Sequence, residues 1–211
     1  MTPIAAKIKN GVRMAEEWWF DRTRSVKTAG YGASPTARQV VGVLGDGQVY
    51  VPVRVAGAHV ALRDLPIKDM SGYLFLDMGS GKGRMLFVAA EYPFRKVQGV
   101  EYETELHELA KANIRTYRHK RRRCGGIESV LANAAEFDFP DGDLVVYLFN
   151  PFGEQVMAKM LANLKAAIQR TPRHVVVLLM YPELSYMFER MPELHLYRKT
   201  RRYHIYQTMS S

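Results

Sequence analysis

The segment YLFLDMGSGKGRMLFVAAEYPFRKVQGVE, residues 73–101, decides the fold of this chain. Residues 73–77 are a short apolar run, which is typical of a buried parallel strand. Three glycines then allow a sharp backbone turn, and the helix-forming run 85–91 comes before a second predicted strand at 97–100. The three glycines are Gly79, Gly81 and Gly83. We therefore expect a strand–turn–helix–strand unit of a doubly wound α/β sheet.

The edge at which these two strands end is the predicted ligand site. In a doubly wound sheet, ligands bind outside the carboxyl ends of the strands, so Asp77, the glycine loop and Glu101 face one crevice. A dinucleotide would require GxGxxG, but here the third glycine comes one place early and Arg84 stands where that pattern needs glycine. Another nucleotide, or a purely structural glycine turn, remains an alternative.

The pattern DxGxGxG, followed by an acid at the end of the next strand, resembles motif I of the class I S-adenosylmethionine (AdoMet) methyltransferases. This resemblance implies a doubly wound, seven-stranded, mostly parallel sheet with an antiparallel last strand, and AdoMet as the cofactor. It also implies that the loop backbone packs on the amino-acid part of AdoMet and that Glu101 accepts both ribose hydroxyls. The cofactor-binding residues that it implies are Asp77, Gly79, Ser80, Gly81, Gly83, Glu101, Tyr102, Asn133, Ala134 and Asn150.

Asn133 follows the predicted third strand, 128–131. In the family this position is usually an aspartate that accepts a hydrogen bond from the adenine amino group. An amide retains an acceptor oxygen, so Asn133 is able to do the same without a charge. A plain turn-forming asparagine is the alternative.

Asn150, Pro151 and Phe152 follow the most apolar predicted strand, 143–150. This ending resembles the (Asp/Asn)-Pro-Pro-(Tyr/Phe) motif of amino-methylating enzymes, which implies that Asn150 and the Pro151 carbonyl accept hydrogens from the target nitrogen and that Phe152 packs on the substrate. The chain has one proline instead of two and its aromatic residue comes one place early, so no substrate is carried over. A structural cap between strand and helix is the alternative.

Periodicity predicts the remaining elements. We expect helices at 5–24, 103–118, 154–170 and 184–190, and further strands at 174–180, 194–199 and 203–208. Leu109 is placed on the inner stripe of the second helix, and the pair Trp18 and Trp19 is interpreted as a packing anchor. His174 and His204 are interpreted as structural histidines rather than bases.

The chain divides into an N-terminal arm, 1–70, which is not expected to form an independent domain, and a methyltransferase domain, 71–211. In the arm, 28–35 reads as a loop and 47–53 as extended chain. The run FDRTRSVKTAG (20–30) and the later YVP (50–52) resemble the arm of a group of small bacterial methyltransferase-like proteins. The resemblance to the class I methyltransferases implies that such an N-terminal arm covers the cofactor and shapes the substrate site.

Composition limits the classes of partner. The 211 residues carry a net charge of +9, and the pI is about 9.7, which favours an acidic partner, whether nucleic acid, an acidic protein face or an anionic membrane surface. The excess is concentrated in two blocks, at 118–123 and 198–202, although solvated loop ends would give the same pattern. No apolar run is long enough to span a membrane, no secretory signal is recognisable, and the single Cys124 has no disulfide partner. We expect a cytoplasmic protein with no metal site.

These features predict an AdoMet-dependent enzyme that methylates the nitrogen of an amine or amide on a protein, nucleic acid or small molecule. The sequence contains no Ser-His-Asp or HExxH constellation, and nitrogen methylation needs no strong general base. Two alternatives remain open, both on the same fold: a protein that binds AdoMet without catalysis, and a nucleic-acid-binding module.

Overall fold

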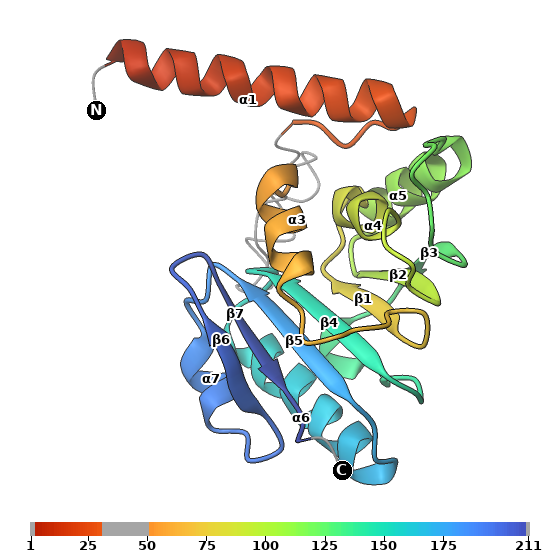
Figure 1. The fold of residues 1–211 in the computed structure, drawn as a ribbon, viewed down its shortest axis with the longest axis vertical. Helices are drawn as coiled ribbons and strands as arrows, with labels where there is room; N and C mark the ends of the chain where they lie inside the picture. Colours follow the sequence, from red (N-terminus) through yellow and green to blue (C-terminus); the bar gives the residue numbers. More distant parts are fainter. Residues whose placement is uncertain (1–2, 31–50, 210–211) are drawn as a thin grey trace.

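The structure, a computed structural model, describes residues 3–30 and 51–209 and contains a single seven-stranded sheet. The strand order is β3-β2-β1-β4-β5-β7-β6 (Figure 1). The strands are β1 (Leu74–Met78), β2 (Lys96–Glu101), β3 (Ile127–Leu131), β4 (Leu144–Phe149), β5 (Val175–Met180), β6 (His195–Lys199) and β7 (Tyr203–Gln207). This confirms the predicted doubly wound fold, with boundaries that differ from the prediction by a residue or two.

The pairing of the strands places the predicted site at one edge of the sheet. β1 pairs in parallel with β2 and β4, β3 joins β2 in parallel, and β5 joins β4 in parallel. β7 runs antiparallel to both β5 and β6. Because β1, β2 and β4 are parallel neighbours, their carboxyl ends, which carry the glycine loop, Glu101 and Asn150, lie side by side.

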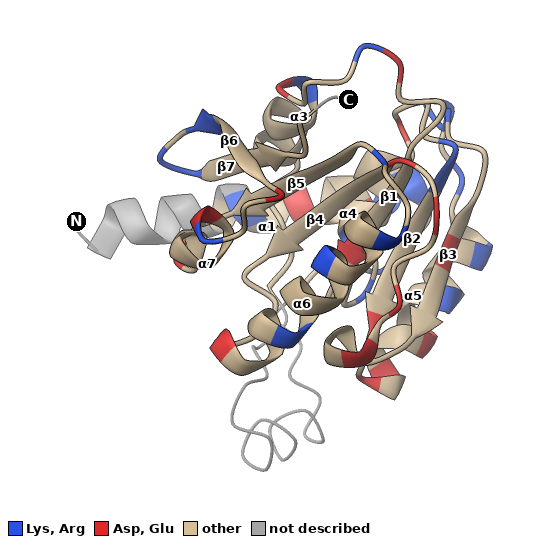
Figure 2. Ribbon diagram, turned by 90° about the horizontal axis from the view of Figure 1, so that it is seen from below, with Lys and Arg blue, Asp and Glu red and all other residues tan. Residues whose placement is uncertain are grey.

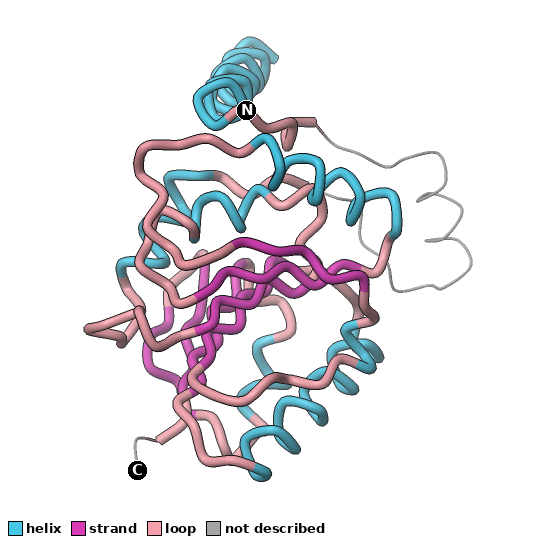
Figure 3. Tube along the Cα trace, turned by 90° about the vertical axis from the view of Figure 1, so that its right-hand side faces the viewer, coloured by secondary structure: helices cyan, strands magenta, loops and turns pink. Residues whose placement is uncertain are grey.

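Helices cover both faces of the sheet (Figure 3). The helices are α1 (Pro3–Arg24), α3 (Val55–Arg63), α4 (Arg84–Ala89), α5 (Thr104–Thr116), α6 (Glu154–Arg170) and α7 (Ser185–Glu189), with a 3-10 turn η1 (Ala134–Glu136). Side chains of α3 and α4 share a buried cluster with Phe75 of β1, whereas α6 and α7 share another with Leu74 and Leu76. This alternation along β1 is the two-residue period of a strand that is buried on both faces.

The last turn of α1 and the segment after it anchor the N-terminal arm. Phe20 is 2% exposed and lies in the same cluster as α3 and α4. Trp18 and Trp19 are 60% and 63% exposed, so the prediction that this pair is a packing anchor was wrong. The final turns of α1 direct Phe20 and Arg24 inward, and Trp18 and Trp19 lie outside that inner face of the helix, which crosses one end of the molecule (Figure 1).

A polar network joins the arm to the start of α4. Asp21 accepts hydrogen bonds from the backbone N–H groups of Thr28 (2.7 Å) and Ala29 (2.8 Å) and from the Thr28 hydroxyl (2.6 Å). Arg84, 3% exposed, donates to the Thr28 hydroxyl (2.8 Å) and lies 3.5 Å from Asp21. The position that excluded a dinucleotide pattern is thus occupied by a residue that connects the glycine loop to the arm.

Three details differ from the predictions or cannot be compared with them. Helix α3 was not predicted, although its buried residues Ala58, Ala61 and Leu62 have helical spacing. Leu109 is 39% exposed, because the inner face of α5 consists of Leu106, His107, Ala110 and Asn113. The predicted loop at 28–35 and extended segment at 47–53 lie largely outside the described residues.

Among the residues that the structure describes, no helix has the length and apolar character needed to cross a membrane.

Candidate active site

The glycine loop leaves β1 in a conformation that few other residues tolerate. Gly79, Gly81 and Gly83 have φ values of +84, +55 and +87 degrees. These values lie in the left-handed region, which glycine enters without a steric penalty. The N–H groups of Gly79 and Ser80 donate to the Val100 carbonyl at 2.8 and 3.1 Å. The loop is therefore fixed to the end of β2, next to Glu101.

Glu101 is the last residue of β2, and its carboxylate faces the glycine loop. One oxygen accepts a hydrogen bond from the Gly81 N–H (2.7 Å) and the other from the Glu103 N–H (2.9 Å). Burial raises the pKa of the Glu101 carboxyl group, although these backbone donors oppose the shift. The fold itself therefore places the Glu101 carboxylate against the glycine loop, and its binding of ribose hydroxyls stays a prediction.

Asp77 is a buried acid on the face of the sheet that α3 and α4 cover. It is 3% exposed, and burial, followed by the nearby Glu101 charge, raises its pKa well above the usual value. Within the described residues, no hydrogen bond or ion pair reaches its carboxylate. A buried acid without a partner is destabilising unless a cationic group lies beside it.

The two predicted motifs meet at Gly79 and Pro151. A Cβ atom on Gly79 would lie 2.5 Å from the Cβ of Pro151, so the glycine loop and the end of β4 are in direct contact. Asn150, between β4 and Pro151, has a φ of +42 degrees. Asparagine tolerates this left-handed conformation better than most residues. The structure therefore brings the expected cofactor loop and the expected methyl-transfer residue to one place.

Phe152 does not occupy the position that the motif resemblance implied. It is 8% exposed and belongs to the core cluster under α6. The chain has only one proline here, so the aromatic ring comes one residue early and turns toward that core. A ring packed in this way offers no open surface for stacking on a substrate.

The remaining predicted cofactor residues lie around the ends of β2 and β3. Tyr102 is 54% exposed directly after Glu101, and Ala134 is a buried residue of η1. Asn133 caps η1, because its side-chain oxygen accepts a hydrogen bond from the Ala135 N–H at 3.0 Å. This is the turn-forming role that was the alternative for Asn133, and the second lone pair of the same oxygen leaves its adenine role as a prediction.

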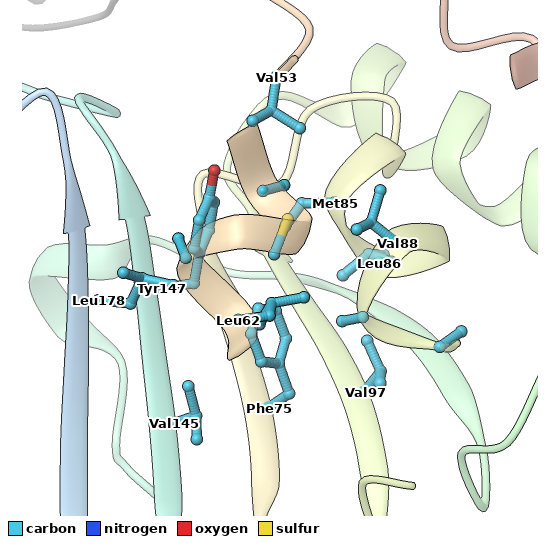
Figure 4. Packing of buried hydrophobic residues seen from close by; sticks show 14 of the residues in the cluster. Val53, Leu62, Phe75, Met85, Leu86, Val88, Val97, Val145, Tyr147 and Leu178 are labelled. Atoms are coloured by element: carbon cyan, nitrogen blue, oxygen red, sulfur yellow. The ribbon is translucent and has the colours of Figure 1, made fainter. Parts of the chain in front are cut away.

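Two tyrosines near the site were missed by the sequence reasoning. Tyr147 of β4 pairs in register with Asp77, and its hydroxyl is buried without a hydrogen-bond partner in the described part of the chain. Figure 4 shows its hydroxyl oxygen directed away from Val145, toward the side on which Val53 lies. Tyr181 follows β5 as Asn150 follows β4, and it is 44% exposed, with its ring 5.4 Å from that of Phe149. The sequence offered one signal for each tyrosine. Tyr147 is a hydroxyl-bearing residue inside an aliphatic strand, and Tyr181 is a polar residue at a strand end.

These features fit a small ligand with cationic and hydroxyl groups. The buried Ser80 hydroxyl of the glycine loop has no hydrogen-bond partner among the described residues. Asp77 provides an acid for a cation, and the Glu101 carboxylate retains lone pairs for hydroxyl donors. AdoMet has both kinds of group, so the residues present fit this cofactor.

Strand order, glycine loop and strand-end acid together define the class I methyltransferase fold. Residues 76–175 match the family model of a methyltransferase domain, which confirms the resemblance inferred from the motifs. The chain thus carries a methyltransferase domain of class I architecture. No sequence of a curated protein matches the chain significantly.

Solved structures with the same fold come from several organisms. A candidate RNA methyltransferase from Pyrococcus horikoshii is 14% identical over 83% of this chain and 98% of its own, with a TM-score of 0.51. A candidate methylase from Haemophilus influenzae is 19% identical over 78% and 94% of the two chains, with a TM-score of 0.51. A predicted N6-adenine-specific DNA methylase from Listeria monocytogenes is 17% identical over 76% of this chain and 52% of its own, also with a TM-score of 0.51. At these identities the likeness establishes the fold.

Proposed function

We propose that this protein is an AdoMet-dependent methyltransferase that methylates the nitrogen of an amine or amide. The observation that carries the proposal is the contact between Gly79 and Pro151, which joins the cofactor loop to the strand end bearing Asn150. Such an arrangement holds a methyl donor and an acceptor at adjacent positions. Correct alignment of the two reactants is the main contribution that a protein makes to this kind of transfer.

On the cofactor side, Glu101 would accept hydrogen bonds from the ribose hydroxyls, and Asp77 would lie near the positive charge of the ligand. When bound, AdoMet supplies an activated methyl group on its sulfonium. The protein has only to position it, exclude water and balance its charge. The raised pKa values of Asp77 and Glu101 support this assignment, because a cationic ligand relieves the unfavourable burial of two neighbouring acids.

On the acceptor side, the side chain of Asn150 and the Pro151 carbonyl would accept the N–H hydrogens of the target nitrogen. Those hydrogen bonds leave the nitrogen lone pair free to attack the methyl group. Because Phe152 is buried, we assign the flat packing surface to Tyr181, whose exposed ring lies against Phe149.

Among the described residues, no group of acids, histidines or cysteines could hold a metal ion.

Calorimetry with AdoMet and with its demethylated product tests the cofactor assignment. We expect both to bind, and neither a nicotinamide nor a flavin nucleotide to do so. Glu101→Ala should weaken AdoMet binding by about 5- to 150-fold, because the ribose hydroxyls lose their acceptor. Glu108→Ala, on the exposed face of α5, is the matched control and should leave the affinity unchanged. Unchanged affinity in a folded Glu101 variant would refute the role of this acid.

The acceptor atom is identified by mass spectrometry of the methylated product. We expect a methyl group on nitrogen and a lower kcat in Asn150→Ala with little change in AdoMet affinity. Transfer to oxygen or carbon would reject the nitrogen assignment. Binding of AdoMet without any methyl transfer, to a wide set of amines, proteins and nucleic acids, would favour the non-catalytic alternative.

A further inference from the structure

A groove of about 620 Å³ lies between the end of α1 and the loop that joins α5 to β3. The last turn of α1 lies beside the α4–α5 layer (Figure 1), and the Arg118 N–H donates to the Arg24 carbonyl at 3.0 Å. The residues that line the groove are Trp19, Thr23, Arg24, Arg118, His119, Lys120 and Arg121. No acidic residue is among these described lining residues, so the groove has a strongly positive lining.

Most of this positive charge is not neutralised within the described chain. Arg24 forms a buried ion pair with Glu91, but Arg118 and Lys120 are exposed and form no ion pair with a described acid. Arg121 is 69% exposed in its side chain and only approaches Glu91, at 4.0 Å. Arg122 and Arg123 extend the same exposed run. Such a cluster of like charges is stabilised by a polyanion, which releases its counterions on binding.

An aromatic ring accompanies the charge. Trp19 lines the groove and is 63% exposed. A tryptophan at the surface of a helix usually packs against something, because its ring has a large apolar area. Exposed aromatic rings next to basic side chains stack on unpaired bases while the cations contact phosphates. An acidic protein surface would use the charges but would leave the ring without a function, so the combination favours single-stranded nucleic acid.

The groove is held in place before any ligand binds. Arg24 is fixed between Glu91 and the ring of Phe20, 4.1 Å from the ring centroid. His119 lies 3.3 Å from the same Glu91, so the loop after α5 and the end of α1 share one buried acid. A preorganised surface loses less conformational entropy on binding than a mobile one.

We propose that this groove binds a single-stranded segment of nucleic acid, with phosphates at Arg118, Lys120 and Arg121 and a base stacked on Trp19. This inference rests on the proposed function, because it identifies nucleic acid as the class of molecule that carries the methyl acceptor. The binding itself is measured without methyl transfer, so the two proposals fail separately.

The test is the fluorescence anisotropy of a labelled single-stranded oligonucleotide of about 16 nucleotides, titrated with the full chain at several salt concentrations. The triple variant Arg118→Ala, Lys120→Ala, Arg121→Ala should lower the slope of log affinity against log salt by about two, because about 0.7 is lost for each phosphate contact to a single strand. The matched control is Lys199→Ala, Arg201→Ala, Arg202→Ala, which removes the same charge from the exposed turn between β6 and β7 (Figure 2). The control should retain the parent slope.

A single substitution tests the stacking ring. Trp19→Ala should weaken binding about 5- to 150-fold, the equivalent of about 1–3 kcal/mol for one stacked base, whereas Trp19→Phe should retain most of the affinity. Because Trp19 is exposed, both variants should have the parent circular dichroism spectrum.

Three results would overturn the proposal: equal losses in the two triple variants, stronger competition by a polyglutamate peptide than by an unlabelled oligonucleotide, or association of the chain with itself that the Trp19 variants abolish. If the protein bound nucleic acid but not AdoMet, the groove proposal would be retained and the proposed function would be rejected. If it bound AdoMet but not nucleic acid, the proposed function would be retained and the groove proposal would be rejected.

Discussion

At the scale of single residues, Gly79 shows why the glycine loop cannot accept other side chains. Its φ of +84 degrees lies in the left-handed region, and the space where a Cβ would point is already filled by Pro151. The turn after β1 requires the left-handed backbone conformation, and the contact with the end of β4 requires that no Cβ atom be present. Both the fold and the proposed methyl-transfer site therefore depend on this one glycine.

Gly79→Ala is expected to lower the free energy of unfolding by about 2–5 kcal/mol, the sum of a left-handed backbone cost and an overpacking cost. Gly142→Ala is the control, because Gly142 also has a positive φ, +96 degrees, but the nearest atom to its added Cβ is the end of the Arg95 side chain at 3.5 Å. It should cost only the backbone part, about 1–2 kcal/mol. Equal losses in the two variants, measured by urea denaturation, would show that the Pro151 contact has no energetic importance.

Asp77 predicts an unusual pH dependence of stability. Burial raises its pKa in the folded protein well above the usual value. Between the unfolded pKa of about 3.9 and that raised value, the folded chain therefore holds a proton that the unfolded chain has released. The contribution of this group to stability is lost as the pH rises through that interval. Asp77→Asn cannot ionise and avoids this loss.

Measured without ligand, the unfolding free energy of Asp77→Asn relative to the parent should increase steadily as the pH is raised from about 4, close to the unfolded pKa, toward neutrality. AdoMet affinity should move in the opposite direction and fall in the variant, since the acid that balances the cation has been removed. A pH-independent stability difference would contradict the assignment of a raised pKa to Asp77.

At the scale of elements, the end of α1 is fixed by the hydrogen bonds that Asp21 accepts from the following turn and by the ion pair of Asp21 with Arg84. Arg84 is the first residue of α4, directly after the glycine loop. The Lys82 ammonium also donates to the Ala29 carbonyl at 3.3 Å. The arm and the glycine loop therefore support each other.

Asp21→Ala should destabilise the protein by about 2–3 kcal/mol, because several donors, among them the buried Arg84, lose their acceptor together. For a chain of this size, the loss corresponds to a fall in Tm of about 4–12 °C. Asp69→Ala is a suitable control, because Asp69 is exposed and accepts a hydrogen bond from the Ser71 N–H two residues away. It should have a much smaller effect on Tm. If both variants melted together with the parent, the arm would not be coupled to the glycine loop through Asp21.

The elements also show what the sequence could predict. The central strands were recognisable because they are short apolar runs, and the last two were recognised as a hairpin around a basic turn. The site edge followed because parallel strands end together. Helix α3 escaped detection because its buried residues are mainly alanines, which give a weak apolar periodicity. The exposure of Trp18 and Trp19 was also unpredictable, since hydrophobic character alone does not show which face of α1 meets the core.

The positions of the candidate site residues were predictable to a similar extent. Asp77, Glu101 and Asn150 lie at or next to the ends of β1, β2 and β4, as expected from the fold, and their roles stay predictions. The orientation of Phe152 was not, since it depends on the side of the sheet toward which the chain turns after Pro151. Tyr147 and Tyr181 were missed because only tertiary packing reveals that they share the face of Asp77 and Phe149.

At the scale of the whole molecule, one ligand would connect three neighbouring strands. AdoMet held by Asp77, Glu101 and Asn150 would link the ends of β1, β2 and β4, which are the centre of the sheet. A ligand that binds only the folded protein raises its stability by RT ln(1 + [L]/Kd), which is about 2.7 kcal/mol when the ligand is present at about 100 times its Kd.

Thermal unfolding monitored by circular dichroism should therefore show a rise in Tm of about 5–11 °C with AdoMet at about 100 times its Kd, since a chain of this size gains about 2–4 °C per kcal/mol. The shift should be smaller in Glu101→Ala at the same ligand concentration, because a weaker Kd lowers the ratio [L]/Kd. Glu108→Ala should show the full shift, since its side chain lies on the exposed face of α5. A parent Tm that does not respond to AdoMet would contradict cofactor binding at this edge of the sheet. Equal shifts in the parent and in Glu101→Ala would support AdoMet binding but contradict a role of Glu101 in it.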